Sequence, residues 1–498
     1  MTDDLVVLRA ESGPIALGPA RHLLELLGVD GDAVPARVAA TVQHRFGRSG
    51  QAAVSLADAT GLESQVRYQL VERIDRSFAE CADLIGRRLT GPATIRVTGA
   101  QRLDAGTRRL LHRLGVMCDH ITVSLEPGRP EGRRRTLDAD ERRTLALHAQ
   151  EHVAAADADW LIERAQLHLH AGDAWTATAL LRPLAHDHDR PALHQVLAVG
   201  HVMLGHPETA ERHYQSWART GTPLDAARAR FGQAMLYARH HAPHLHDDTR
   251  AAALLDQALT DLDRAGTDDV TLDRIFNRNG YAVLQVRAGK VDEALAFLDE
   301  ALEAMTPTTE KNHLHRAALM YHRAHIKRRI GEHAAATREY RKLLDVDPDM
   351  PEYHMELALS HMVLGEWAQA VDELDRARDL DPYIPEAHAL RAQIAEQQGE
   401  RDAAIALHRQ AWRIAPDDPE RVYAYAYALS ESQDWTEVIA LLDGGPVHAD
   451  LSCVLAEALV NVGRTDDAVA CLTDALELAP DDENLRDNLA TVRQAAHA

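Results

Sequence analysis

Three glycines in the C-terminal half of the chain recur at a constant interval of 34 residues, at Gly331, Gly365 and Gly399. Each has an alanine five residues later and a proline seventeen residues later, namely Ala336, Ala370, Ala404 and Pro348, Pro382, Pro416. A fixed period of this length is typical of array proteins, in which each copy packs only on its neighbours. The interval therefore predicts an elongated array of repeats, which a chain of 498 residues can form without one central core.

Each marker residue has a physical reason to stand where it does. Glycine ends a first helix, because the left-handed backbone conformation has no Cβ penalty there. The alanine lies where two helices approach most closely, and the proline ends the second helix and can begin the next one. Apolar residues between the markers recur at three- and four-residue spacing, as in Leu357, Leu359, Leu364, Val371 and Leu374. This spacing predicts two amphipathic helices in each copy.

Weaker copies extend the array in both directions. A copy without the glycine covers 433–442, and the full pattern returns between Gly463 and Pro480. Upstream copies begin at Gly172, Gly205 and Gly289, and residues 224–264 hold one more pair of helices. We expect about nine helical pairs over 157–480. A polar helix over 483–496 is expected to cap the apolar end of the array.

This pattern resembles the tetratricopeptide repeat family. A small residue before the end of the first helix is also present, at Ala324, Ala358, Ala392 and Ala456. The resemblance implies a mostly α, right-handed solenoid whose first helices line a concave groove for an extended or helical peptide. On that alignment, the residues on or near the groove are Asn279, His325, Arg328, Arg329, Met355, Met362 and Gln393.

These groove residues suggest how a ligand is held. Arg328 and Arg329 form a basic spot that can bind a peptide carboxylate through charge-assisted hydrogen bonds. Asn279 can hold the ligand backbone, and Met355 and Met362 offer adaptable apolar contacts. The alternative stays open for each residue, since exposed arginines are often only solvated and methionines at helical spacing often belong to the core.

Residues 1–125 lack the repeat and alternate between strand-like and helix-like segments. Short β-branched runs predict strands over 5–10, 94–99 and 120–126, and helices are expected over 16–27, 62–89 and 104–114. This order predicts a small α/β domain. A Pro/Gly/Arg-rich linker over 126–136 follows it, and the array occupies 137–498.

Two segments of this domain resemble the nucleotide-binding domain of signalling ATPases that carry C-terminal helical repeats. Gly13 and Gly18 have the spacing of a phosphate-binding loop, but Pro19 and Ala20 replace the Lys and Ser/Thr. A second strand ends in residues 98–100, Thr-Gly-Ala, where the family has acidic residues for magnesium. The resemblance implies a degenerate domain without hydrolysis, because both electrostatic stabilisers of phosphoryl transfer are missing. We favour the alternative of an unrelated small α/β domain, and in neither case do we expect turnover.

The charge of the chain limits its partners. The formal net charge is −23, while residues 1–150 hold 21 arginines and 19 acidic residues. The array is therefore strongly acidic, which disfavours nucleic acid and membrane surfaces and favours a basic partner with salt-sensitive association. The four cysteines form no close pair, and we find neither a secretory signal nor an apolar run that could span a bilayer. A cytoplasmic location is expected.

Histidines supply the remaining candidates for chemistry. His148, Glu151 and His152 match the His-x-x-Glu-His arrangement of one zinc-peptidase class, and chance accounts for one such match among 29 histidines. The His-rich segment 240–248 can capture a metal if it is helical, but Pro243 favours a solvated loop. We therefore expect no catalytic residue, metal or cofactor.

The sequence as a whole predicts a non-catalytic scaffold or adaptor that binds a protein or peptide. Two alternatives remain at this stage: a nucleotide-responsive regulator that acts through the N-terminal domain, and a metalloenzyme built around His148 and His152. The oligomeric state and the identity of the partner stay open.

Overall fold

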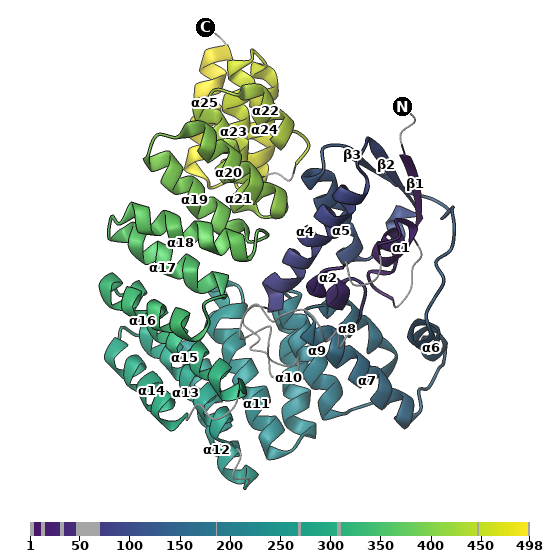
Figure 1. The fold of residues 1–498 in the computed structure, drawn as a ribbon, viewed down its shortest axis with the longest axis vertical. Coiled ribbons are helices and arrows are strands. Elements are labelled where there is room, and N and C mark those ends of the chain that lie inside the picture. Colours follow the sequence, from purple (N-terminus) through teal and green to yellow (C-terminus); the bar gives the residue numbers. More distant parts are fainter. Residues whose placement is uncertain are drawn as a thin grey trace. The chain divides into compact units, whose positions relative to one another are not determined.

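A computed structural model describes residues 4–10, 15–29, 34–45, 70–185, 187–266, 270–305, 310–445 and 448–496 (Figure 1). They form two compact units, Met1–Gly365 and Glu366–Ala498. All four cysteines are free thiols. None of the helices within the described ranges is long and apolar enough to cross a membrane.

The chain begins with the predicted small α/β fold. Strands β1 (Asp4–Arg9), β2 (Ala93–Thr98) and β3 (Ile121–Glu126) form a parallel sheet in the order β1-β2-β3. The helices around the sheet are α1 (Gly18–Leu26), α2 (Ala36–Thr41), α4 (Leu70–Arg88) and α5 (Ala105–Met117). The strand predictions and the helices expected over 16–27 and 104–114 are confirmed to within a few residues. Of the helix expected over 62–89, residues 62–69 lie outside the described residues and the rest forms α4.

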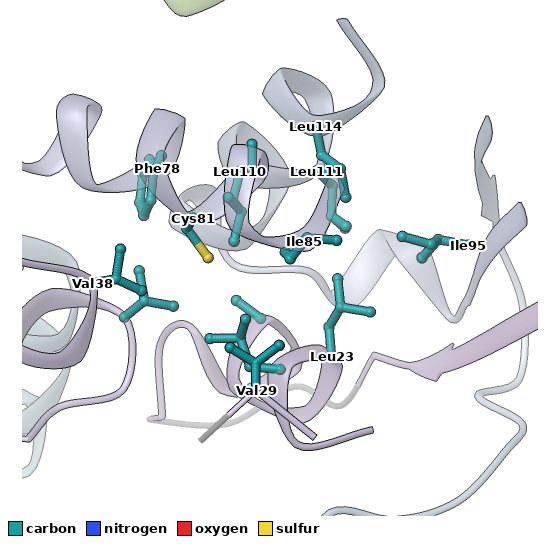
Figure 2. Packing of buried hydrophobic residues seen from close by; sticks show 14 of the residues in the cluster. Leu23, Val29, Val38, Phe78, Cys81, Ile85, Ile95, Leu110, Leu111 and Leu114 are labelled. Carbon is teal, nitrogen blue, oxygen red and sulfur yellow. The ribbon is translucent and has the colours of Figure 1, made fainter. Parts of the chain in front are cut away.

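The core of this domain lies between the sheet and its helices. Buried side chains from α1, β2, α4 and α5 meet there, among them Leu23, Ile95, Phe78, Ile85, Leu110 and Leu114 (Figure 2). Trp175, from the first repeat, packs against the same cluster, and its ring stacks on Phe78 with centroids 5.9 Å apart. The hydrophobic core therefore continues from the α/β domain into the array.

Paired helices follow α6 (Ala139–His148) in the first unit. They are α7 (Ala155–His170) with α8 (Ala174–Leu180), α9 (Pro191–Met203) with α10 (Pro207–Thr220), α11 (Pro223–Met235) with α12 (Asp248–Ala265), α13 (Thr271–Arg287) with α14 (Val291–Ala304), and α15 (Glu310–Arg329) with α16 (His333–Val346). The first helix α17 (Pro351–Val363) ends this unit. First helices of successive pairs contact each other, as α7 contacts α9 and α15 contacts α17.

The second unit continues the alternation. It contains α18 (Trp367–Leu380), α19 (Pro385–Gln397), α20 (Arg401–Ile414), α21 (Pro419–Glu431), α22 (Trp435–Leu442), α23 (Ala449–Asn461), α24 (Thr465–Leu478) and α25 (Glu483–Ala496). Within the described residues, five helical pairs lie in the first unit and three in the second, and α17 and α18 follow each other along the chain as a ninth, which matches the predicted number of about nine. The final helix has the predicted bounds and buries Leu485 and Leu489 against α23 and α24. It therefore covers the apolar surface that a last repeat leaves open.

The repeat markers adopt the expected conformations. Gly331, Gly365 and Gly399 have φ of 87°, 73° and 76°, in the left-handed region that favours glycine. The following alanines, such as Ala404 between α19 and α20, are buried where the two helices of a pair meet. In the copy that lacks the glycine, Gln433 adopts the same conformation, with φ of 60°. The helical geometry is therefore kept there despite a side chain that disfavours it.

Candidate protein-binding surface

The predicted groove residues Asn279 and His325 contact neighbouring helices within the first unit. Asn279 Oδ1 lies 2.9 Å from Nδ1 of His322, one repeat further along. Burial lowers the pKa of His322 to about 4, so this imidazole is neutral at pH 7 and its Nδ1–H donates to the asparagine oxygen. His325 lies 3.8 Å from the carboxylate of Glu356 on α17. Side-chain contacts therefore link α13, α15 and α17.

Glu356 is the centre of a polar cluster that includes Arg328. Its carboxylate accepts hydrogen bonds from Tyr321 at 3.1 Å and Tyr340 at 3.2 Å, and Arg328 Nε lies 2.9 Å away. Burial acts to raise the pKa of Glu356, but the hydrogen bond from His325 and the charge of Arg328 lower it below the ordinary value. Arg328, which the sequence suggested for a ligand carboxylate, thus binds a carboxylate of its own chain.

The remaining predicted groove residues differ in exposure. Arg329 is exposed next to Arg328, and Met355 and Met362 are half-buried on α17. Gln393 is exposed on α19, in the second unit. The structure thus brings His325 and Arg328 together at α17 and leaves Arg329 and Gln393 accessible.

The α/β domain also reaches α17. Arg76 of α4 donates a hydrogen bond to Oε1 of Glu352 over 2.6 Å, and only 12% and 10% of the two side chains are exposed. Glu352 lies one helical turn before Met355. Helix α17 is therefore contacted by the N-terminal domain on the turn that precedes a predicted groove residue.

Two exposed tyrosines on α21 were missed by the sequence reasoning. Tyr423 and Tyr427 are 39% and 47% exposed, and their rings stack with centroids 6.0 Å apart and 20° between the planes. Tyr425, between them, is buried on the opposite side of the helix and donates a hydrogen bond to Glu437. The four-residue spacing of Tyr423 and Tyr427 places both on one helical face, and that spacing is the signal that could have found them.

Carboxylates surround this aromatic face. Exposed acidic residues on the first helices α19, α21 and α23 are Glu386, Glu396, Glu420, Glu431, Asp450 and Glu457. The charge of Glu431, together with partial burial, raises the pKa of Tyr427, and Glu396 contributes in the same direction. Arg421 is half-buried and lies within 4 Å of three acidic side chains, those of Glu386, Asp418 and Glu420. The face is therefore aromatic and acidic.

The His-x-x-Glu-His string does not assemble. Helix α6 ends at His148, so the two histidines are not one helical turn apart on the same helix. His148 contacts the carbonyl of Leu180, while His152 is exposed and pairs with Asp187 at 2.7 Å. This geometry does not form the metal site that the zinc-peptidase reading requires.

The His-rich segment forms a connection, as expected from Pro243. Helix α11 passes through a π-helical turn (Leu236–His240) and a short 3-10 turn (Pro243–Leu245) before α12 begins after its cap residue Asp247. His246 contacts the carbonyl oxygen of His241 at 2.9 Å, which holds the loop in place. The segment therefore interrupts one helical pair.

A buried polar cluster joins the α/β domain to the first repeat. Asp173 Oδ2 lies 2.7 Å from His44 Nε2 and 3.3 Å from His168 Nδ1. Donor atoms of these three side chains lie within 4.8 Å of one another, a grouping that can suit a metal ion. However, the guanidinium of Arg21 contacts both His44 and Glu141 in the same cluster. A cationic side chain thus already balances the buried carboxylates, and this disfavours a further cation.

The carboxyl end of the sheet, where α/β proteins bind nucleotides, is covered by the segment that leads to the array. Thr98 Oγ1 bonds to both the backbone N–H and the carbonyl of Glu131, each at 2.8 Å. Gly99 has φ of 73°, and a Cβ there would meet Pro130 at 2.8 Å. Gly13 lies outside the described residues. The segment therefore packs over the carboxyl end of β2, and the nucleotide-responsive alternative stays open.

Comparison with known proteins identifies the repeats. Family models described as tetratricopeptide repeat match residues 274–349, 321–385, 356–419, 395–452 and 454–486. Residues 274–452 and 454–486 therefore belong to the tetratricopeptide repeat family. A search of curated proteins found no match.

Solved structures with similarity to the chain include those of PilF, a thermophilic TPR protein and YrrB. PilF of Pseudomonas aeruginosa is 18% identical, with 44% of this chain and 99% of PilF covered and a TM-score of 0.33. A thermophilic TPR protein of Thermus thermophilus is 23% identical. The similarity covers 44% of this chain and 99% of that protein, with a TM-score of 0.26. YrrB, described as a TPR protein with an unusual peptide-binding site, is 17% identical. The similarity covers 40% of this chain and 91% of YrrB, with a TM-score of 0.27.

Proposed function

We propose that this chain is a non-catalytic scaffold that holds a protein or peptide partner on the first helices of its repeats. The observation that carries the proposal is the stacked pair Tyr423 and Tyr427, which exposes two large rings on α21. Aromatic side chains are enriched at protein interfaces because they contribute a large contact area at a small cost in conformational entropy. The partner therefore docks first on the face formed by α19, α21 and α23.

The seven predicted groove residues take different parts in this proposal. Gln393 belongs to the face of the second unit and can hydrogen-bond to a ligand backbone. Arg329 is exposed and can contact a ligand directly. Asn279, His325 and Arg328 have partners within the chain, so a ligand has to displace those contacts. Met355 and Met362 are half-buried and contribute only part of their surface.

The acidic charge of the array indicates the kind of partner. We infer a basic or arginine- and lysine-containing polypeptide in the cytoplasm, and we expect neither nucleic acid, membrane, metal nor cofactor as a ligand. Association between such surfaces is steered by long-range electrostatics, which salt screens. Binding is therefore expected to weaken as ionic strength rises, and unchanged binding at high salt would contradict this part of the proposal.

Site-specific crosslinking in the full chain tests where the partner binds. A photoreactive benzoylphenylalanine replaces Tyr427 on α21 in one variant and Leu478 on α24 in the control. Leu478 is 71% exposed, so the control position is at least as accessible as Tyr427. The proposal predicts one defined crosslinked product from position 427 and not from 478. Equal crosslinking at both positions, or none at 427, argues against the first-helix face.

A further inference from the structure

In the first unit, a tyrosine ring and a glutamate carboxylate of the repeats bind one arginine side chain of the same chain. Tyr237 donates a hydrogen bond to Glu211 Oε1 at 2.6 Å, and Arg250 donates to the same oxygen at 3.0 Å. The guanidinium carbon of Arg250 lies 4.1 Å from the centre of the Tyr237 ring. The ring face and the carboxylate thus hold one arginine together, by cation–π attraction and by a charge-assisted hydrogen bond.

Helix α21 carries the same two acceptors for a cation. Glu431 follows Tyr427 by one helical turn, and its negative charge raises the pKa of the tyrosine. Both side chains are exposed. Among the residues that the structure describes, no lysine or arginine forms an ion pair with Glu431. The pair therefore resembles Tyr237 and Glu211 without the arginine.

The surroundings of Tyr427 also favour a cation. Tyr423 stacks on the ring and extends the exposed aromatic surface along the helix. Glu396 of α19 is close enough for its charge to act on Tyr427, and its carboxylate lies 2.9 Å from the imidazole of His408. The nearby Arg421 lies among three other carboxylates. The local charge is therefore negative next to an exposed π surface.

We propose that Tyr427 and Glu431, flanked by Tyr423 and Glu396, bind an arginine side chain of the partner polypeptide. The inference rests on the proposed scaffold function and specifies the chemistry of one contact. Arginine fits better than lysine because its planar guanidinium can stack on the ring while it donates to the carboxylate. Its weaker hydration also lowers the cost of leaving water.

Binding of defined peptides to the full chain tests this assignment. The probe is a fluorescein-labelled peptide with three arginines separated by Gly-Ser spacers, together with its lysine and citrulline counterparts. Fluorescence anisotropy is expected to give the tightest binding for arginine, weaker binding for lysine and the weakest for citrulline, which keeps the planar shape but lacks the charge. Glu431→Gln should weaken arginine-peptide binding about tenfold, and Tyr427→Leu about threefold.

The matched control is Glu477→Gln on the second helix α24, which makes the same change in net charge at an exposed position. It should leave the affinity for the arginine peptide unchanged. If Glu431→Gln and Glu477→Gln weaken arginine-peptide binding equally, the effect comes from the net charge of the chain and the proposal is overturned. Equal affinity for the citrulline peptide, or no effect of Tyr427→Leu, would overturn it too. All three positions are exposed, so the variants should fold, and circular dichroism checks that they do.

This outcome can be separated from a failure of the scaffold function. If the partner still crosslinks at position 427 while Glu431→Gln leaves peptide affinity unchanged, only the arginine assignment fails. If no partner crosslinks there, the proposed function itself fails at this face.

Discussion

Arg76 in the α/β domain and Glu352 on α17 form a hydrogen-bonded ion pair of 2.6 Å, although 276 residues separate them in the sequence. Both side chains are largely buried, so each charge helps to compensate the other. The N-terminal domain therefore contacts a repeat far along the array as well as the first repeat at Trp175.

Breaking this pair should loosen α4 and α17 together. Arg76→Met and Glu352→Gln are each expected to lower the local stability of both helices by about 2 kcal/mol, because each leaves a poorly solvated partner. The double variant should lose less stability than the sum of the two single variants, with a coupling energy of about 0.5–3 kcal/mol. Hydrogen exchange of peptides from α4 and α17 measures these values. Arg87→Met, which removes an exposed ion pair with Asp83, is the control and should cost under about 0.5 kcal/mol. Strictly additive effects would show that the contact is not formed.

The left-handed residue Gln433 offers a stabilising substitution. Gln433→Gly should raise the stability of the second unit by about 1 kcal/mol, because it removes the steric cost of a positive φ at a non-glycine residue. Gly399→Ala, at the corresponding position of the preceding copy, should lower stability by about the same amount. Thermal unfolding measures both, and a lower melting temperature for Gln433→Gly would contradict the repeat alignment.

A histidine cluster in α9 and α10 predicts acid sensitivity. Burial and the neighbouring His194, His201 and Arg212 lower the pKa of His213 to about 4. The unfolded chain binds a proton at this residue near pH 6.5, whereas the folded chain does so only near pH 4. The free energy of unfolding is therefore unaffected by this residue above about pH 6.5. It decreases as the pH falls toward 4, because the unfolded chain takes up the proton first. His213→Gln should flatten the decline of melting temperature in that window, while the loop variant His244→Gln should not. If the melting temperature of His213→Gln had the same pH dependence as that of the wild type, the assignment of this acid sensitivity to His213 would be wrong.

The buried cluster at the domain junction is expected to contribute to stability through charge. Asp173→Asn keeps a side chain able to cap α8, but it removes the carboxylate that contacts His44 and His168. We expect a loss of about 3 kcal/mol, because the buried Arg21 loses part of its compensation. Asp434→Asn, at the exposed cap of α22, should change stability by under about 0.5 kcal/mol. Chemical unfolding compares the two, and equal effects would argue against a charged network.

The repeats could be predicted from the sequence because their determinants are local. The glycine that ends a helix, the alanine at the helix crossing and the proline that follows are each required by backbone or packing geometry within one copy. The same locality explains why the bounds of α25 were predicted correctly. The fold of the array therefore follows from spacing alone.

The candidate site was harder to predict because it depends on contacts between distant residues. Arg328 was expected in the groove, and nothing local in the sequence indicates that Glu356 binds it. The contact between Arg76 and Glu352 likewise has no sequence signal. Tyr423 and Tyr427 have a helical spacing that places them on one face, but the spacing does not say whether that face is buried or exposed.

The central claim is that the first-helix face around α21 binds the partner, and an affinity pull-down from the native cells tests it most directly. The bait is the full chain, because removing residues 1–136 would expose the core that packs on Trp175. The wild type is compared with the double variant Tyr423→Ala/Tyr427→Ala and with Glu477→Gln, using quantitative mass spectrometry. The account predicts that one specific protein is retained by the wild type and by Glu477→Gln and is at least about tenfold depleted on the double variant. Equal retention by all three baits would contradict it.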